Sequence, residues 1–311
     1  MSVASAVAHP NIAVVKYWGK RDVAANLPAV PSVSLALGPW HTRTQVRWGA
    51  AADVVQVGAA PAPPAFAAKA LAHLDRLFPG RPRCAIETQN DFPTGAGLAS
   101  SASGFAALTV AAAAAAGLDP DPDTLSRWAR MGSGSASRSI PGGWAAWWDE
   151  AARPIAPPDW WPVAMVVAVV AEGEKAVGST AGMQRSAATS PYWPAWLAGG
   201  PALAREAEDA ILARDLERLG VAMEASTFQM HATMHTAQPP LIYWQPATLA
   251  ALHATAALRQ RGVGAWATMD AGPQVKVLCR AEDAPAVTAA LAPIALRTVT
   301  LLPAGGARRV P

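Results

Sequence analysis

Two lysines stand four residues apart in the run Lys16-Tyr17-Trp18-Gly19-Lys20, which follows an apolar stretch. Their side chains share a face whether the segment is a strand or a helix, because both periods bring positions i and i+4 together. Two ammonium groups on one face suit a multiply charged anion. A solvated lysine pair is the commoner explanation of such spacing, but an unpaired charge beside Tyr17 and Trp18 at the end of an apolar strand would be costly.

Residues 91–104 are rich in glycine and serine and lie between an expected strand and an alanine-rich helix. Glycines let backbone amides approach an anion, and the unpaired N–H groups of the following helix favour negative charge. The segment therefore predicts a phosphate cradle. It is not a Walker loop, because no Gly-Lys-Ser/Thr follows, and it matches the Rossmann fingerprint poorly. The alternative is a serine-capped helix after a glycine turn.

Residues 132–139, Gly-Ser-Gly-Ser-Ala-Ser-Arg-Ser, place Arg138 in a run of small side chains. A guanidinium can bind a carboxylate or a phosphate through two parallel hydrogen bonds. As a helix the segment groups Ser135, Arg138 and Ser139, whereas as a strand it does not. A flexible linker is the alternative interpretation.

Asp270 lies in residues 267–273, between two apolar segments. Asp, Gly and Pro favour a turn here, but a carboxylate at the end of an apolar strand can be partly buried and act as a base. His231 and His235 have the spacing of a zinc-binding helix. We expect no zinc site there, because position 232 is alanine where a metalloprotease has glutamate, and no third ligand is evident.

The elements that must position these residues form a mixed pattern. Residue type and length predict strands at residues 12–18, 42–48, 83–88, 163–171 and 275–279. Helices are expected at residues 65–77, 102–116, 124–131, 202–213, 216–232 and 246–261. The chain turns helix-rich after residue 171, so we expect an α/β protein with an N-terminal lobe of residues 1–172 and a C-terminal lobe of residues 173–311.

The composition excludes several classes of protein. Of 311 residues, 52% are hydrophobic and 15% are charged, which excludes a disordered chain. A net charge of +3 without a basic block argues against nucleic-acid binding. The longest uncharged helix candidate would rise roughly 25 Å, short of the roughly 30 Å of a hydrocarbon core, so no membrane span is expected. Two cysteines and no signal peptide fit a cytoplasmic protein.

Six runs of this sequence, taken in order, resemble the diphosphomevalonate decarboxylases, a family of the GHMP kinase superfamily. They are residues 11–22, 92–108, 132–139, 179–183, 231–234 and 269–273. The resemblance implies a two-lobed α+β, GHMP kinase-like fold with the active site in the cleft between lobes. It implies ATP-dependent decarboxylation of (R)-5-diphosphomevalonate to isopentenyl diphosphate, with transient 3-phosphorylation, in the mevalonate pathway. ATP and Mg²⁺ would be the cofactors, and a homodimer is expected.

The resemblance also implies roles for the matched residues. Asp270 would abstract or orient the hydroxyl proton, Lys16 would stabilise charge near the 3-hydroxyl, and Arg138 would hold the substrate carboxylate. Further contacts to the substrate, mainly its diphosphate, would come from Tyr17, Lys20, Ser133 and Ser135. The ATP phosphates would be held by Gly95, Gly97, Leu98, Ala99, Ser100, Ser101 and Ser103. Ser101 is the candidate Mg²⁺ ligand, and a loop closing over ATP would include Lys175 and Ser179.

Three positions depart from the family pattern. Val30-Pro31 stands where Asn-Ser is more frequent, Ser137 where Cys is usual, and Gln274 where Asn is usual. None removes a charged group, although the first could alter substrate contacts. The alternatives are a GHMP-type kinase, a decarboxylase acting on phosphomevalonate or mevalonate, and a catalytically silent nucleotide-binding protein. Such relatives tend to lose parts of the lysine segment or the aspartate, and both are present here.

Overall fold

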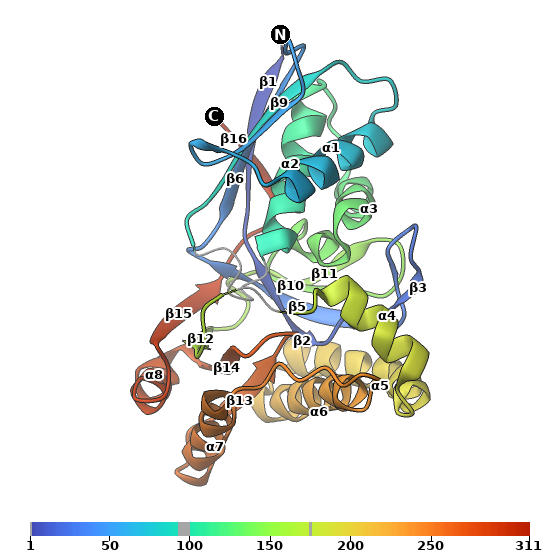
Figure 1. Cartoon of the computed structure of the whole chain (residues 1–311). Helices are drawn as coiled ribbons and strands as arrows, with labels where there is room; N and C mark the ends of the chain where they lie inside the picture. The colour runs from blue at the N-terminus through green and yellow to red at the C-terminus, as the bar shows by residue number, and fades with distance from the viewer. Residues whose placement is uncertain (1, 93–99, 174–175) are drawn as a thin grey trace.

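Two antiparallel-rich sheets and their helices form the molecule, which we describe from a computed structural model covering residues 2–92, 100–173 and 176–311 (Figure 1). The first sheet has the order β16-β1-β6-β9-β7-β8. Its strands are β1 (Val3–Ala8), β6 (Thr42–Trp48), β7 (Val54–Val57), β8 (Ala60–Pro61), β9 (Cys84–Asn90) and β16 (Arg308–Val310). The helices of this lobe are α1 (Pro64–Leu77), α2 (Ser100–Ala115) and α3 (Pro122–Gly132).

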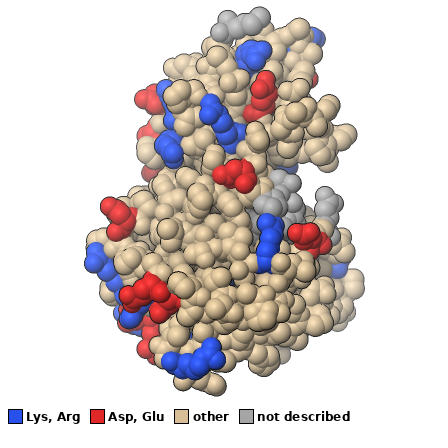
Figure 2. All heavy atoms as spheres, turned by 90° about the vertical axis from the view of Figure 1, so that its left-hand side faces the viewer, with Lys and Arg blue, Asp and Glu red and all other residues tan. Residues whose placement is uncertain are grey.

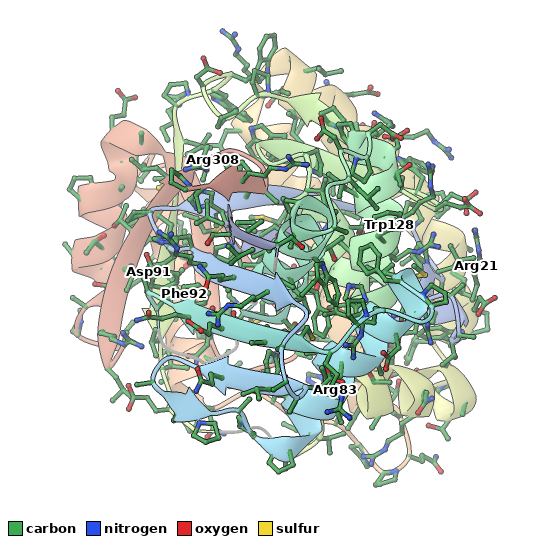
Figure 3. All side chains as sticks on the ribbon, turned by 90° about the horizontal axis from the view of Figure 1, so that it is seen from above. Arg21, Arg83, Asp91, Phe92, Trp128 and Arg308 are labelled. Carbon is green, nitrogen blue, oxygen red and sulfur yellow. The ribbon has the colours of Figure 1, made fainter. Side chains whose placement is uncertain are left out.

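Helix α2 is central to this lobe because it is apolar on every side. Alanine makes up much of it, and it packs on β1 and β6 on one side and on α3 on another. A helix that is hydrophobic all round belongs in a core, and most residues of α2 are buried. Figure 3 looks down on this lobe. Asp91 and Phe92 follow β9 and lie at the opposite end of that strand from Arg83, which precedes it.

The second sheet has the order β11-β10-β5-β15-β12-β14-β13, with β2 also paired to β5. Its strands are β2 (Asn11–Val15), β5 (Ser32–Gly38), β10 (Trp144–Trp147), β11 (Ala152–Ala156), β12 (Val163–Val169), β13 (Ala265–Met269), β14 (Val275–Arg280) and β15 (Arg297–Pro303). The remaining elements are β3 (Lys20–Asp22), β4 (Leu27–Pro28), η1 (Gly134–Ser139), α4 (Ser179–Thr189), α5 (Trp193–Ala213), α6 (Leu216–His235), α7 (Pro246–Gln260), η2 (Ala281–Asp283) and α8 (Ala284–Leu291).

The sequence of strand β12 is apolar throughout because every residue of the strand is buried. Met165 and Val167 pack in the cluster that includes residues of α5 and α6, whereas Val166 and Ala168 pack in the cluster that includes residues of α7 and α8. Because side chains alternate between the two faces of a sheet, a strand covered by helices on both faces has no polar positions. Helices therefore lie on both faces of this part of the sheet (Figure 1).

Strand pairing crosses the expected lobe boundary near residue 172. Strand β12 precedes that boundary but pairs with β14 and β15, which follow it. The chain then returns to the first sheet, where β16 pairs with β1. The division into residues 1–172 and 173–311 remains a prediction.

The expected strands and helices are all present, with shifted ends. Strand β2 ends at Val15 rather than Trp18, and α5 begins at Trp193 rather than at residue 202. Pro194 and Pro201 argued against a helix in the first turns of α5, because proline usually breaks helices. Pro194, however, occupies a position in the first turn where proline is tolerated. None of the described helices is long and apolar enough to cross a membrane. Figure 2 shows charged side chains scattered over one face without a continuous patch.

Candidate active site

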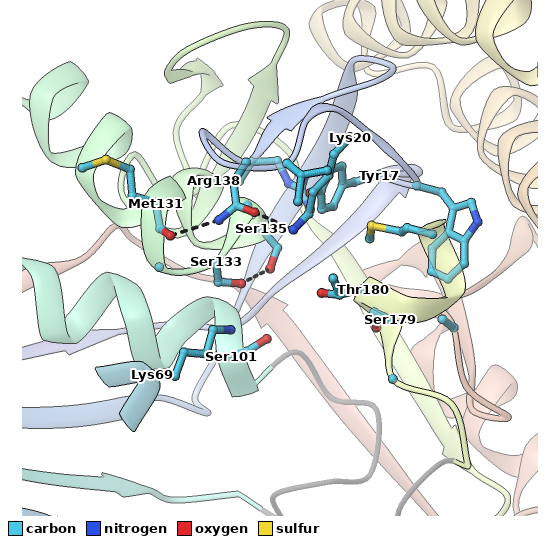
Figure 4. A pocket seen from close by; sticks show the side chains of 18 of the residues that line it. Tyr17, Lys20, Lys69, Ser101, Met131, Ser133, Ser135, Arg138, Ser179 and Thr180 are labelled. Atoms are coloured by element: carbon cyan, nitrogen blue, oxygen red, sulfur yellow. Dashed lines mark hydrogen bonds between the residues drawn. The ribbon is translucent and has the colours of Figure 1, made fainter. Parts of the chain in front are cut away.

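A pocket of about 890 Å³ is lined by residues from distant parts of the chain, from Asn11 on β2 to Ala271 after β13 (Figure 4). The described residues that line it include charged side chains of both signs: Lys20, Lys69, Arg76, Arg138 and Asp270. Cations outnumber the carboxylate, so the pocket favours an anionic ligand.

Asp270 is held by two lysines. Lys16 Nζ donates to Asp270 Oδ1 at 2.8 Å, and Lys276 Nζ donates to Asp270 Oδ2 at 2.9 Å. Both lysine side chains are 1% exposed, whereas the aspartate side chain is 33% exposed and lines the pocket. The carboxylate is therefore the part of this cluster that a ligand can reach.

The local fold explains this arrangement. Asp270 directly follows β13, and the turn that it begins leads into β14, where Lys276 pairs with Thr268 of β13. Lys16 directly follows β2, and its backbone N–H donates to Ser226 Oγ of α6 at 2.9 Å. Three separate segments thus bring one carboxylate and two ammonium groups together at the pocket.

Burial and pairing act in opposite directions on these groups. Burial disfavours the charged form of Asp270, but the two lysines outweigh it and hold the pKa of this carboxyl well below its usual range. The pKa of Lys16 falls to about 8, because burial and the charge of Lys276 lower it by more than Asp270 raises it. The aspartate is therefore an ionised hydrogen-bond acceptor at neutral pH.

Arg138 lies on η1 and is 3% exposed. Its Nε donates to Asn11 Oδ1 at 3.2 Å, and its Nη1 donates to Ser32 Oγ at 2.6 Å. Burial lowers its pKa to about 10, which still leaves it charged at neutral pH. Because a guanidinium has five N–H donors, these two bonds leave others for a ligand. The helical alternative for residues 132–139 is confirmed, and Ser135 and Ser139 both bond to Asn11.

Tyr17 and Lys20 approach the pocket from the segment after β2. The Tyr17 hydroxyl is buried without a hydrogen-bond partner among the described residues, and burial raises its pKa. Lys20 Nζ donates to Asn26 Oδ1 at 2.5 Å, and Asn26 Nδ2 donates to the carbonyl of Met131 at 3.0 Å. Asn26 therefore anchors the hairpin that carries Lys20 to the end of α3.

Two helices begin at the pocket. Ser100 and Ser101 of α2, and Ser179 and Thr180 of α4, line it (Figure 4). Helix N-termini favour phosphate groups. Ser103, which was expected to contact ATP, points elsewhere: it is fully buried and its hydroxyl bonds Thr42 Oγ1 at 2.7 Å.

The structure brings most of the expected residues together. Besides Asp270 and Arg138, the expected residues that line the pocket are Tyr17, Lys20, Ser100, Ser101, Ser133, Ser135 and Ser179. Lys16 does not line the pocket but binds Asp270, which does. Ser103 is not among the lining residues, because two residues along a helix turn a side chain to a different face, here toward β6. The remaining expected ATP contacts lie outside the described residues: Gly95, Gly97, Leu98, Ala99 and Lys175.

Sequence reasoning missed Lys276, Lys69 and Arg76. Lys276 carried a usable signal, because a lone lysine between Val275 and Val277 in an apolar strand needs a buried partner. Lys69 and Arg76 lie on α1, and nothing in the sequence distinguished them from solvated helix residues. They line the pocket because of how α1 packs, and Figure 4 shows Lys69 on the same side of the pocket as Ser101.

His231 and His235 lie side by side, with ring centroids 5.9 Å apart. Among the described residues no group of three or more His, Cys, Asp or Glu could hold a metal ion. Burial lowers the pKa of His231 to about 3, so it is neutral at neutral pH.

Two of the positions that depart from the family pattern have structural roles: Val30 packs in an apolar cluster, and Gln274 Oε1 accepts a hydrogen bond from the N–H of Val170 at 2.7 Å.

The chain is similar to known proteins along most of its length. Residues 8–154 match the diphosphomevalonate decarboxylase-like N-terminal domain, and residues 165–300 match the mevalonate 5-diphosphate decarboxylase C-terminal domain. The diphosphomevalonate decarboxylase of Gibberella zeae is 34% identical over 92% of this chain and 83% of its own length.

Two solved structures share the whole architecture. Mevalonate diphosphate decarboxylase from Staphylococcus aureus has a TM-score of 0.95 and 32% identity, over 100% of this chain and 98% of that one. MDDEF in complex with MVAPP, AMPPCP and magnesium has a TM-score of 0.93 and 35% identity, over 99% of both chains. The fold is thus the mixed α and β, GHMP kinase-like fold. The chain belongs to the diphosphomevalonate decarboxylase family.

Proposed function

We propose that this protein catalyses the ATP-dependent decarboxylation of (R)-5-diphosphomevalonate to isopentenyl diphosphate, with release of ADP, phosphate and carbon dioxide, in the mevalonate pathway. The observation that carries the proposal is the pocket in which an ionised Asp270 faces a set of cations, with Arg138 near enough for the two charges to influence each other. The family membership supports the same activity.

Arg138 is proposed to hold the substrate carboxylate. Asn11 and Ser32 fix the guanidinium plane, so its remaining N–H groups are oriented before the ligand arrives. Tyr17, Lys20, Ser133 and Ser135 surround the same space and are proposed to bind the rest of the substrate, mainly its diphosphate. The unpartnered Tyr17 hydroxyl supports this role, because a buried hydroxyl needs a partner.

Asp270 and Lys16 are proposed to act at the 3-hydroxyl. The exposed part of the Asp270 carboxylate would accept a hydrogen bond from this hydroxyl and aim its oxygen, while the Lys16 charge would stabilise developing negative charge. Phosphorylated, the hydroxyl becomes a leaving group; phosphate then departs, and the bond to the carboxylate breaks to give carbon dioxide and the electron pair of the alkene.

ATP with Mg²⁺, when bound, supplies that phosphoryl group, and the described residues fit such a ligand. Two helix N-termini and the side chains of Lys69 and Arg76 line one pocket, and Ser101 offers a hydroxyl for Mg²⁺. Asp270 is the one carboxylate among the described residues that line the pocket, and two lysines already bind it. The phosphates themselves would therefore supply most of the metal's oxygen ligands.

The test is turnover of three substrates side by side. Purified protein with ATP and Mg²⁺ is given diphosphomevalonate, phosphomevalonate or mevalonate, and both carbon dioxide and ADP are measured. We expect both products, in equal amounts, with diphosphomevalonate. ADP without carbon dioxide would instead indicate a kinase, and preference for phosphomevalonate would change the substrate.

We further propose a cytoplasmic homodimer. Free, buried Cys84 and Cys279 agree with a reducing compartment. Sedimentation equilibrium of the purified chain tests the oligomeric state, and fractionation of the source cells tests the location.

A further inference from the structure

Lys276 contacts Asp270, which lines the pocket, but is not itself among the described residues that line it. Its side chain is 1% exposed. Its Nζ lies 2.9 Å from Asp270 Oδ2, on the opposite carboxylate oxygen from the one that Lys16 binds. A substrate in the pocket would therefore meet a carboxylate whose two oxygens are each already fixed by a buried ammonium group.

Burying a lysine in a sheet has a cost that calls for a reason. Lys276 lies on β14 between Val275 and Val277, and its neighbours across the sheet are Val167 and Thr268. An apolar side chain at this position would fill the same space without desolvating a charge, and buried ion pairs often stabilise less than such a replacement. The lysine is therefore better explained by what it does to Asp270 than by stability.

We infer that Lys276 is a positioning residue for the decarboxylation: it fixes the Asp270 carboxylate toward the pocket so that it accepts a hydrogen bond from the substrate hydroxyl and orients it rather than removing its proton. The hydroxyl proton would then pass to an oxygen of the transferred phosphoryl group and leave with the phosphate. This inference rests on the proposed function. The sequence left two roles open for Asp270: to orient the substrate hydroxyl or to abstract its proton. Within the proposed function, Lys276 favours the orienting role.

Among the described residues, the charged and titratable groups around Asp270 come from four parts of the fold. They are Lys16 after β2, Lys276 on β14, Arg138 on η1 and His231 on α6. Three of them are cations and the histidine is neutral. Removing the Lys276 charge raises the pKa of Asp270, because it loses a partner, and also raises the pKa of Lys16, because it loses a repelling neighbour.

The experiment compares Lys276→Met with the wild type over a range of pH. The variant should bind ATP within twofold of the wild type, while kcat falls roughly 10- to 100-fold, the range expected when a group that orients a ligand is removed. The acidic limb of the kcat profile should move to higher pH, and the basic limb should also move up from its wild-type position near the Lys16 pKa of about 8. Lys276→Arg, which keeps the charge, should restore part of kcat.

A double-mutant cycle separates positioning from a structural role. If Lys276 acts through Asp270, adding Lys276→Met to Asp270→Asn should lower kcat little further, because the group it positions has already changed. This double variant also removes the carboxylate whose Oδ2 would be left without its Lys276 partner, so it provides a measurement if Lys276→Met alone does not fold. Additive losses of kcat would overturn the inference.

Leu278→Val is the matched control, because Leu278 lies two residues further along β14 and is fully buried. It should lower the melting temperature and leave the pH profile in place. A Lys276→Met profile that superimposes on the wild-type profile would contradict the inference. Absence of carbon dioxide release from the wild type would instead contradict the proposed function.

Discussion

Asn11 accepts a hydrogen bond from Arg138 Nε at 3.2 Å, although 127 positions separate the two residues. The amide group of Asn11 also donates to the carbonyl of Ser135 and to Ser139 Oγ, at 3.0 and 2.8 Å. One buried side chain on β2 thus fixes both ends of η1 and the direction of its guanidinium. The site is preorganised by strand β2 rather than by η1 alone, because a short 3-10 helix has weak hydrogen-bond geometry of its own.

Arg138→Lys tests whether guanidinium geometry, rather than charge, holds the substrate. Lysine keeps the charge but loses the planar fork, and its single ammonium cannot reach Asn11, Ser32 and a carboxylate together. We expect kcat/KM for diphosphomevalonate to fall about 100-fold, or about 2.7 kcal/mol of transition-state stabilisation, with ATP affinity unchanged. Steady-state kinetics and ATP titration measure both.

Arg83→Lys is the control for that substitution, since Arg83 is exposed and precedes β9 (Figure 3). Its kinetics should match the wild type. Near-normal kcat/KM in Arg138→Lys would show that charge alone suffices at this position.

Asp270→Asn tests the carboxylate directly. The substitution keeps the shape but removes the charge that both Lys16 and Lys276 bind. We expect turnover to fall by about three orders of magnitude or more, as for other essential groups, while ATP binding is preserved. Calorimetric ATP titration beside a carbon dioxide assay makes the distinction, and near-normal turnover would remove Asp270 from the mechanism.

Gly134→Ala tests how closely η1 packs on Tyr17. A Cβ at Gly134 would lie 2.7 Å from the Tyr17 hydroxyl oxygen and 2.9 Å from the Trp147 ring. Both side chains are packed, so we expect a loss of about 1–3 kcal/mol in the free energy of unfolding and a raised KM for diphosphomevalonate. Urea unfolding and kinetics provide the measurements.

Gly104→Ala on helix α2 is the matched control, because a Cβ there meets no atom of the described residues within 4 Å. Alanine should stabilise that helix by up to about 1 kcal/mol and leave KM unchanged. Equal effects of the two substitutions would contradict the packing argument.

The sequence pattern was sufficient for the parts of the fold that depend on local preference. The continuous apolar run of β12 and the alanine-rich α2 were recognisable because burial on all sides removes polar positions. The start of α5 was not, because prolines and glycines read as breaks where packing overrides propensity. Strand order was also out of reach, since β16 returns to β1 from the other end of the chain.

In the candidate site, too, residues that a local sequence pattern marks were predicted, and those that depend on tertiary packing were not. Lys16 and Asp270 were recognisable as charges at the ends of apolar segments, and Arg138 as the single charge in a run of small residues. Ser103 was placed wrongly, since the serines of one run point to different faces of α2. Lys276 was missed because its role depends on the register of β13 with β14, which no local pattern contains.

Two buried histidines should make stability depend on pH. Burial lowers the pKa of His73 and of His231 to about 3, below the ordinary histidine pKa of 6.5 that is expected in the unfolded chain. Between these values the unfolded state binds more protons, so the free energy of unfolding decreases as pH falls below 6.5. Each histidine contributes a slope of about 1.4 kcal/mol per pH unit where the unfolded chain is fully protonated.

His73→Gln should remove one of these slopes. Urea unfolding between pH 5 and 7, where the carboxylates remain largely ionised, should give a shallower pH dependence for the variant than for the wild type. Thr109→Val is the control: it removes the hydroxyl that His73 Nε2 bonds at 3.0 Å but leaves the histidine in place. It should lower stability at every pH by a similar amount, and an unchanged slope in His73→Gln would show that His73 is already protonated in the folded protein.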